Sequence, residues 1–465
     1  MLSFKMTERE FAISVVRQLQ DAGHEALWAG GCVRDELLGL TPKDYDVATS
    51  AIPEAVQQLF RRTLAIGASF GVVEVLGPRQ DRFQPKVQVA TFRIDGGYSD
   101  GRRPDQVVFS SAREDALRRD FTVNGMFFDP IKGELIDFVG GQNDLHARIL
   151  RAIGEPEVRF QEDKLRLLRA VRIATRFDLT IEPRTQAAIA LMAGALPVVS
   201  AERIAEELRQ LLVHPRRVRG LNHLLDLGLA AAILPELVPM KGLPQGLPTQ
   251  PSGDLWNHVM RVMDLLGPAP SFPLAMATLL HDVGKPATAG RTAAPDEATS
   301  SSTLSPGEGP VVRDRYTFYH HEHVGARMAD AIALRLKLSN EERKRIVWLV
   351  EKHQYLADAQ RMRPSKLKVV LNDPGIHELL TLHRADALAS GKSIENIEFC
   401  EELLRKWTPN ELNPPPFVTG YDLKRLGVMP GPRYKELLDA VREAQLDGTT
   451  KTREEALALL QGLIG

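Results

Sequence analysis

The sequence of 465 residues has only two cysteines, Cys32 and Cys400, and no long apolar run. Two cysteines so far apart exclude a disulfide framework and a four-cysteine zinc site, and they are typical of a reducing compartment. The lack of a run of about eighteen apolar residues excludes a membrane-spanning helix. Acidic residues at Glu8 and Glu10 stand where a signal peptide would be apolar. We therefore expect a cytoplasmic protein that is not exported and has no membrane partner.

Neither sign of charge dominates, because 59 Lys and Arg stand against 60 Asp and Glu, for a net charge of -1. This balance neither predicts nor excludes a nucleic-acid partner. Residues 151–219 are rich in arginine and carry a net positive charge. Such a segment is typical either of a surface that follows RNA phosphates or of a solvated helical face. The length predicts about two to four domains of an ordinary globular protein.

Hydrophobic periodicity divides the chain into an α/β part followed by a longer helical part. Short β-rich runs at 26–29, 71–76 and 87–92 alternate with helical segments in the first 150 residues. Three consecutive prolines at 414–416 mark a late boundary. We predict four domains: a head over 1–150, a helical neck over 151–220, a helical body over 221–410 and a helical tail over 411–465.

The body contains a segment of biased composition. Most residues between Pro286 and Pro310 are Ala, Ser, Thr, Gly or Pro, which leaves few apolar side chains to pack. We predict a mobile insertion over 286–315.

A predicted strand, turn and helix surround Gly30 and Gly31. Glycines at such a turn let a phosphate approach the backbone, and Arg34 would add a positive charge for a triphosphate. A dozen residues later, strand alternation places Asp44 and Asp46 on one face. Two adjacent carboxylates repel each other unless they share divalent cations, as two-metal phosphoryl and nucleotidyl transfer requires. We predict that they hold Mg²⁺.

These residues open an ordered series of motifs that resembles the class II tRNA nucleotidyltransferases and their poly(A) polymerase relatives, within the polymerase-β-like superfamily. The motifs occupy residues 30–35, 44–46, 90–93, 100–104, 118–124, 162–172 and 202–208. The resemblance implies an α/β polymerase-β-like head before an all-α neck, body and tail. It also implies that Arg119, Asp163, Arg166, Arg169 and Arg172 contact the nucleotide.

The residues themselves suggest how a base could be read. In one helix starting near residue 161, Asp163 and Arg166 fall in the same sector as the apolar residues. They could simply form an ion pair with each other. Alternatively, the pair could read a base. An ionised Asp accepts and an Arg donates, which matches the amine donor and ring-nitrogen acceptor on the pairing edges of cytosine and adenine. Uracil and guanine present donor and acceptor in the opposite order. The pair would then admit CTP and ATP.

Three features bear on the details of this resemblance. Relatives commonly carry a Glu where this chain has Gln88, so the third acidic ligand is open, with Glu74 as a substitute. The run 66–71 lacks the basic residues common in the poly(A) polymerases, which favours the tRNA enzyme. The loop 95–104 favours an enzyme that adds the terminal A.

A second cluster lies in the body, where eight of the twelve histidines fall between His258 and His383. The string His281-Asp282-Val283-Gly284-Lys285 resembles the HD-domain metal-dependent phosphohydrolases. Ligands from neighbouring helices would complete one or two metal sites. Besides Mg²⁺ in the head, we therefore predict a divalent transition metal as a second cofactor, held in the body. The candidate ligands are His258, His281, Asp282, His321, His353 and Asp386.

We therefore predict a template-independent transferase that adds all or part of the 3′-terminal CCA to tRNA from CTP and ATP. The products are the extended tRNA and pyrophosphate. The alternatives are a poly(A) polymerase of the same family, or an HD phosphohydrolase or RNA-binding protein with a degenerate head. The sequence does not separate CCA from CC-only or A-only addition, and it leaves the oligomeric state open.

Overall fold

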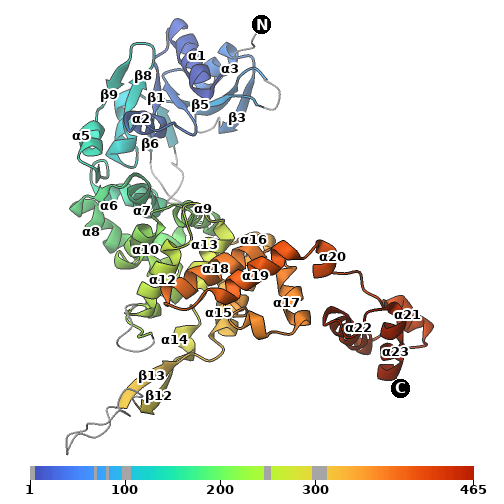
Figure 1. Cartoon of the computed structure of the whole chain (residues 1–465). Helices are drawn as coiled ribbons and strands as arrows, with labels where there is room; N and C mark the ends of the chain where they lie inside the picture. Colours follow the sequence, from blue (N-terminus) through green and yellow to red (C-terminus); the bar gives the residue numbers. More distant parts are fainter. Residues whose placement is uncertain are drawn as a thin grey trace, which may run out of the picture. The chain divides into compact units, whose positions relative to one another are not determined.

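A computed structural model describes residues 6–67, 71–79, 83–96, 106–245, 253–295 and 312–464. The chain forms two compact units, Met1–Pro235 and Glu236–Gly465 (Figure 1). The predicted body, 221–410, crosses the boundary between these units. The four domains remain a prediction. Within the described residues, no helix is long and apolar enough to cross a membrane.

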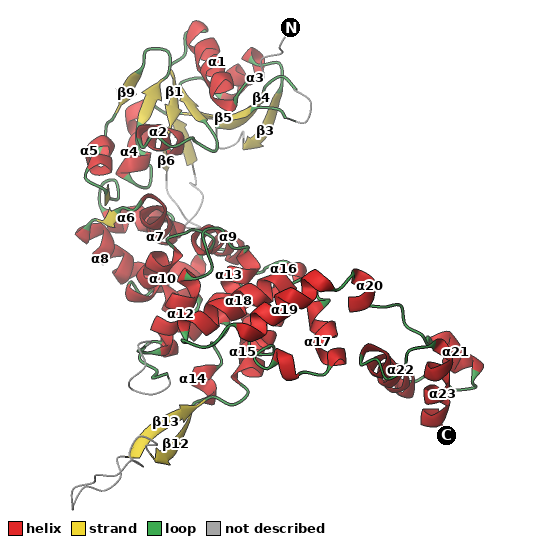
Figure 2. Cartoon of the chain, in the orientation of Figure 1, coloured by secondary structure: helices red, strands yellow, loops and turns green. Residues whose placement is uncertain are grey.

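The first unit is built on a seven-stranded sheet with the order β3-β4-β5-β2-β1-β8-β9. Its strands are drawn in yellow in Figure 2. Adjacent strands are antiparallel except for β2 and β5, which are parallel. The three strands predicted from the sequence correspond to β1, β4 and β5 within one residue. The bounds are β1 Ala26–Ala29, β2 Asp46–Thr49, β3 Thr63–Gly67, β4 Val72–Leu76, β5 Lys86–Thr91, β8 Phe127–Asp129 and β9 Glu134–Ile136.

Helices cover both faces of this sheet. Helix α1 (Glu8–Asp21) begins with a capping box between Thr7 and Glu10 and packs its apolar side on β1 and β5. On the opposite face, α4 (Ala112–Leu117) packs against β1 and β8. The apolar cluster under α4 consists of Leu27, Ala29, Ala48, Phe92, Ala112, Ala116 and Phe127. The carboxylates at the start of β2 lie on this second face.

The neck helices of the first unit follow the sheet. Helix α7 packs on α9 and α10, and the predicted apolar residues of α7 are buried. The helix bounds are α6 Pro156–Glu162, α7 Leu165–Phe177, α8 Pro183–Met192, α9 Ala201–Leu212 and α10 Arg217–Asp226.

The prediction of one continuous helix through Asp163 is wrong. Helix α6 ends at Glu162, and Asp163 has extended backbone with φ -143° and ψ 106°. Its carboxylate accepts a hydrogen bond of 3.0 Å from the backbone N–H of Leu165 at the start of α7. Asp residues compete with helix formation in this way because their side chains satisfy free N–H groups. Asp163 therefore stands at a helix junction.

The second unit is mainly helical. Its central helices are α12 Leu255–Asp264, α13 Phe272–Leu280, α14 Lys285–Thr288, α15 His321–Arg335, α16 Asn340–Lys352, α17 Pro364–Leu371, α18 Ile376–Ala389 and α19 Glu395–Lys406. The predicted insertion begins within α14, and its ends pair as an antiparallel sheet of β12 (Gly290–Pro295) and β13 (Val312–Thr317). The composition gives no sign of these strands, because a hairpin satisfies its backbone hydrogen bonds without an apolar core. The remainder, 296–311, lies outside the described residues, as do 97–105 of the loop predicted in the head and 68–70 of the run 66–71.

The tail forms its own small core after the three prolines. Helices α21 (Gly420–Arg425), α22 (Pro432–Leu446) and α23 (Arg453–Ile464) bury six apolar residues together. Asp447 accepts a hydrogen bond of 2.8 Å from the backbone N–H of Ser365 at α17 and pairs with Arg363. The buried residues are Val418, Leu423, Leu437, Val441, Ala456 and Leu460.

Candidate active site

The turn after β1 brings the backbone close to a guanidinium group. Gly30 has φ +75°, and a β-carbon there would lie 2.8 Å from Nη1 of Arg119. A larger residue is disfavoured both by this conformation and by the contact. The predicted glycine turn before α2 (Gly31–Leu37) is therefore present.

The two predicted carboxylates stand together beside this turn. Asp44 lies in the loop before β2, and Asp46 is the first residue of β2. The pKa of the Asp46 carboxyl is raised to about 6, first because neighbouring groups exclude water from it and then because of the Asp44 charge. A group that resists ionisation beside another carboxylate is suited to a divalent cation, which offsets both charges.

The structure places both candidates for a third polar ligand. Strand register puts Gln88 directly opposite Asp46, and Glu74 directly opposite Gln88. Glu74 is thus two strand spacings, roughly 10 Å between α-carbons, from Asp46. It is buried and forms an ion pair of 3.0 Å with Lys86. Gln88 is therefore the immediate neighbour of Asp46, and Glu74 lies one strand further away, on the far side of Gln88.

The predicted nucleotide-contacting residues surround one cavity of about 530 Å³. Every predicted residue of the head and neck site lines it, and Arg118, Asp120, Asn124, Ile173 and Arg203 complete the wall. The predicted members are Gly30, Gly31, Arg34, Asp44, Asp46, Arg119, Asp163, Arg166, Arg169 and Arg172. Their roles toward a nucleotide remain predictions.

Asp163 and Arg166 have partners other than each other. Two guanidinium nitrogens of Arg203 on α9 lie 2.7 and 3.3 Å from the Asp163 carboxylate. Arg166 donates to the Glu162 carboxylate at 2.6 Å and to the backbone carbonyls of Arg159 and Arg118 at 2.9 and 3.2 Å. Asp163 is thus held by Arg203, and Arg166 by Glu162 and two backbone carbonyls, so the two residues do not form the ion pair with each other that their spacing allowed.

Arg34 is more embedded than the sequence indicated. It is buried, donates to the Asp35 carboxylate at 2.6 Å and to the Asn124 side-chain oxygen at 2.5 Å, and lies 3.8 Å from the ring centre of Phe177. These contacts join the glycine turn to the end of α7. Its proposed contact with a triphosphate remains a prediction.

Asp120 is a buried anchor of the same wall. It pairs with Arg169 at 2.7 Å and accepts from the Asn124 side chain at 3.0 Å. Burial alone would raise the pKa of Asp120, but the Arg169 charge and the Asn124 hydrogen bond hold it well below its usual range. This carboxylate therefore stabilises the fold in its charged form.

We expect Asp120→Asn to lower the free energy of unfolding by about 1–3 kcal/mol at pH 7. Because the folded-state pKa is depressed, the contribution is present above the unfolded pKa of about 3.9 and is lost as pH falls below it. Urea unfolding should show the wild-type advantage shrinking by about 1 kcal/mol between pH 5 and pH 3. Glu155→Gln, at an exposed pair with Arg184, should change little. A constant difference across this range would contradict the assignment.

The body gathers all six predicted histidine and aspartate ligands. His258 lies on α12, His321 begins α15 and Asp386 lies on α18. His281 and Asp282 directly follow α13, and His353 directly follows α16. Their ligand atoms form two groups, each within 4.8 Å: His258, His281 and Asp386, and Asp282, His321 and His353.

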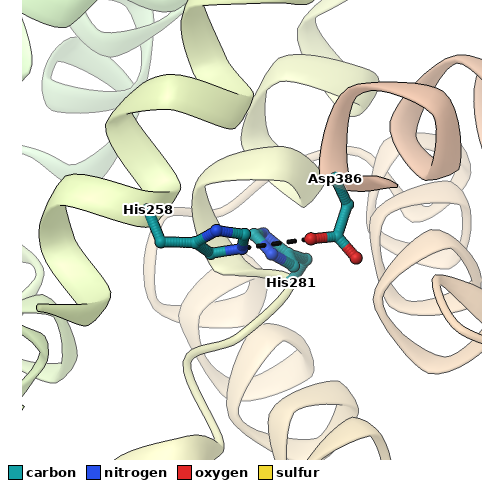
Figure 3. A group of neighbouring side chains, drawn as sticks. All are labelled: His258, His281 and Asp386. Atoms are coloured by element: carbon teal, nitrogen blue, oxygen red, sulfur yellow. Dashed lines mark ion pairs between the residues drawn. The ribbon is translucent and has the colours of Figure 1, made fainter. Parts of the chain in front are cut away.

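Figure 3 shows the first group, with the three side chains converging from different helices. Nε2 of His258 lies 3.1 Å from the Asp386 carboxylate. Asp282 stands between the groups, because one carboxylate oxygen is 3.2 Å from His281 and the other is 3.2 Å from His321. A carboxylate in this position can bridge two metal ions.

The hydrogen bonds of the histidines leave a lone pair for a metal. In His281, His321 and His353, Nδ1 lies 2.8, 2.8 and 2.7 Å from the backbone carbonyl three residues earlier. A carbonyl only accepts, so Nδ1 carries the proton and Nε2 is free to ligate. Within the described residues, Nε2 of His258 and His281 and one oxygen of Asp282 are buried close to other ligand groups without forming a hydrogen bond. The donor set therefore fits divalent transition metals.

Gly284 lets the loop after these ligands pass α15. A β-carbon there would lie 2.2 Å from the carbonyl oxygen of His321 and 2.7 Å from the nitrogen of Gly325. We expect Gly284→Ala to cost about 2–3 kcal/mol of stability, because backbone atoms cannot move aside as a flexible side chain can. Thermal unfolding of the full chain would test this. Gly462→Ala, where a β-carbon meets open space, should be neutral or stabilising. Equal melting temperatures would contradict the close contact.

Three family descriptions match the chain in order. The "Poly A polymerase head domain" matches residues 26–151, the "Probable RNA and SrmB- binding site of polymerase A" matches 178–240, and the "HD domain" matches 255–391. The predicted family resemblance and the predicted fold class are confirmed.

Curated relatives are named CCA-adding enzyme. One from Lactiplantibacillus plantarum is 43% identical over 219 residues, covering 47% of this chain and 52% of the relative. One from Geobacillus stearothermophilus is 41% identical over 47% of this chain and 53% of its own. The chain thus spans about half the length of the curated relatives it matches.

Solved structures resemble the whole chain. The Bacillus stearothermophilus CCA-adding enzyme in complex with CTP has a TM-score of 0.67 and 26% identity, covering 99% of this chain and 98% of its own. The Thermotoga maritima enzyme complexed with tRNA has a TM-score of 0.56 and 18% identity, covering 98% and 95%, and supports the fold alone. The chain therefore carries a poly A polymerase head domain, the RNA-binding region that accompanies it and an HD domain, in that order, and it is similar to the CCA-adding enzymes.

Proposed function

We propose that the first unit transfers CMP and AMP from CTP and ATP to the 3′-hydroxyl of a tRNA that lacks part or all of its CCA end. The observation that carries this proposal is one cavity that joins the Asp44 and Asp46 carboxylates to Asp163 and Arg166. In the reaction, the RNA 3′-oxygen bonds to the α-phosphorus, pyrophosphate leaves, and the hydroxyl proton passes to water. Mg²⁺ held by Asp44 and Asp46 would neutralise the phosphate charge.

Base selection follows from how the protein holds two side chains. Arg203 holds the Asp163 carboxylate, whose oxygens accept hydrogen bonds. Among the described residues, partners engage three of the five N–H groups of Arg166, which leaves two to donate. An acceptor beside a donor matches the amine and ring nitrogen of cytosine and adenine, whereas uracil and guanine present the reverse order.

The relatives support this substrate set. Solved structures of CCA-adding enzymes are described in complex with CTP, with ATP and with tRNA. A degenerate nucleotide sensor would not need both the carboxylate pair and the base-reading pair in one cavity.

Extension of a tRNA that ends at the discriminator base tests the proposal, with Mg²⁺ and each nucleotide singly and then CTP with ATP. Addition of two C residues and one A is the expected result. Addition of C alone, or of A only to a tRNA ending in CC, would define a specialised enzyme. Long A tails would instead favour a poly(A) polymerase, and binding without incorporation a sensor.

A second activity is favoured by the six ligands of the body. We propose that this site hydrolyses a phosphate ester with two divalent transition metals. Asp282, which is close to ligands of both groups, would help to hold the ions, and Lys285, whose Nζ lies 2.7 Å from Asp282, would face the phosphate. The bound metals would supply a hydroxide nucleophile near neutral pH. The support is the uniform Nε2 orientation of three buried histidines.

We expect His281→Ala to lose at least one of two bound metals and about a hundredfold or more of the hydrolysis of bis(p-nitrophenyl) phosphate. Metal content by mass spectrometry and hydrolysis with Ni²⁺, Mn²⁺ or Co²⁺ would measure both. CMP incorporation should be unaffected. His377→Ala, an exposed histidine on α18, is the matched control. Full metal content in His281→Ala would contradict the site.

We also propose a cytoplasmic location. Cys32 and Cys400 are both buried and unpaired, which is typical of proteins in a reducing compartment. Fractionation of cells with an antibody to the chain would test it.

A further inference from the structure

A row of side chains crosses the head sheet at the level of Asp46. Strand register aligns Asp46 on β2 with Gln88 on β5, Gln88 with Glu74 on β4, and Glu74 with Leu64 on β3. Residues directly opposite in a sheet point to the same face. Gln88 and Leu64 are exposed on that face. The catalytic face therefore continues outward from Asp46 over β5, β4 and β3, in the sheet order visible in Figure 2.

The nucleotide cavity lies on the other flank of β2. Strand β2 pairs with β5 on one side and with β1 on the other. Gly30 and Gly31 directly follow β1. The remaining lining residues come from α2, from the segment between α4 and β8, and from the neck. A triphosphate at this cavity would lie on the β1 side of the two carboxylates.

Phosphoryl transfer places the attacking and leaving oxygens roughly in line on opposite sides of the phosphorus. If pyrophosphate leaves on the β1 side, the RNA hydroxyl must arrive from the β5 side. The residues beside the carboxylates there are Gln88, opposite Asp46, and Lys86, two residues earlier on the same face. Because β2 and β5 are parallel, Lys86 precedes Gln88 along the same direction in which Asp44 precedes Asp46.

Lys86 is held at this position by a buried acid. Its Nζ lies 3.0 Å from the Glu74 carboxylate, and its side chain is 60% exposed whereas that of Glu74 is 7% exposed. A buried carboxylate orients the ammonium group, which keeps its remaining N–H donors for another anion. Single-stranded RNA brings one phosphate per nucleotide to such a donor.

We propose that the strip formed by Leu64, Lys86 and Gln88 binds the 3′-terminal nucleotide of the RNA, an inference that rests on the proposed transfer reaction. Lys86 contacts its phosphate, the Gln88 amide hydrogen-bonds its ribose next to the reacting hydroxyl, and Leu64 packs against its base. Glu74 is a positioning residue that holds Lys86. The strip thereby completes the site with a place for the second substrate.

Steady-state kinetics on the full chain would test the strip, with CTP and a tRNA that lacks CCA. Lys86→Ala should raise KM for tRNA about tenfold, leave KM for CTP unchanged, and flatten the salt dependence of RNA binding by about 0.7 in log–log slope. Glu74→Gln should raise KM for tRNA by a smaller factor. Gln88→Ala should lower kcat without changing KM for CTP.

Lys132→Ala is the matched control, because Lys132 is 66% exposed and pairs with the buried Asp129 at the β8–β9 turn. A 4-thiouridine at the RNA 3′ end should photo-crosslink to peptides containing residues 63–67 or 86–91. If wild type extends tRNA but Lys86→Ala behaves like Lys132→Ala, or the crosslinks map only to α7 and α9, the strip is wrong and the proposed function stands. If wild type incorporates no nucleotide, the proposed function fails and the strip fails with it.

Discussion

Asp44→Asn and Asp46→Asn are each expected to lower CMP incorporation at least about a thousandfold while leaving tRNA binding within about twofold. Asn has almost the same shape as Asp but carries no charge, so it keeps the packing of the loop and of β2 while removing an ionic metal ligand. Metal stabilisation of developing charge supplies several kcal/mol of the barrier reduction, and each 1.36 kcal/mol is tenfold in rate. The readout is single-turnover incorporation at saturating tRNA, with tRNA affinity measured separately.

The raised pKa of Asp46 gives this prediction a second readout that does not depend on turnover. A carboxyl whose folded-state pKa is raised to about 6 opposes folding once it is ionised, fully above that pH and not below the unfolded pKa of about 3.9. At pH 7.5 without metal, Asp46→Asn should therefore melt at the same or a higher temperature than wild type. Mg²⁺ should raise the melting temperature of wild type more than that of the variant.

Asp21→Asn, at an exposed position at the end of α1, makes the same chemical change away from the site and should alter neither rate nor metal response. Retained incorporation in Asp46→Asn would remove the carboxylate pair from the mechanism. An equal response to Mg²⁺ in wild type and in Asp46→Asn would place the metal elsewhere.

The parts of the site that sequence alone predicts are those whose members are close in the chain. Asp44 and Asp46 are two residues apart, and strand alternation alone puts them on one side. The glycine turn follows from two adjacent residues. Arg203 and Asn124 were missed as site residues because their partners, Asp163 and Arg34, are 40 and 90 residues away. Only the packing of α9 and the head on α7 brings these groups together.

The junction at Asp163 shows a different limit. Apolar periodicity carries through the sequence on both sides, so it favours one helix. The Asp163 side chain, which accepts from the first N–H of the next helix, interrupts the helix without changing the hydrophobic pattern. Resemblance to a family identified the HD ligands, yet the carbonyls that orient His281, His321 and His353 belong to the backbone three residues earlier. Backbone hydrogen bonds of this kind leave no mark on residue identity.

The second large effect is expected at Arg203, a residue that need not touch the nucleotide. Its two nitrogens at 2.7 and 3.3 Å, with the Leu165 N–H at 3.0 Å, fix the Asp163 carboxylate. Arg203→Ala removes the charge that holds Asp163, so the carboxylate can turn away from the base. We expect the ratio of kcat/KM for CTP to that for UTP to fall about tenfold to a hundredfold, since a well-placed pair of hydrogen bonds discriminates by about 1–3 kcal/mol.

Asp163→Asn separates loss of the acceptor from loss of its position. The carboxamide keeps an acceptor but gains a donor, which can meet the O4 acceptor of uracil, so UTP should gain relative to CTP. Arg184→Ala, an exposed neck arginine, removes the same charge without touching the cavity and should leave the ratio unchanged. Single-turnover incorporation of each of the four nucleotides measures all three variants. A ratio that stays at the wild-type value in both Arg203→Ala and Asp163→Asn would mean that other residues of the cavity read the base. A change in these two variants alone would show that Arg203 positions Asp163 for base selection.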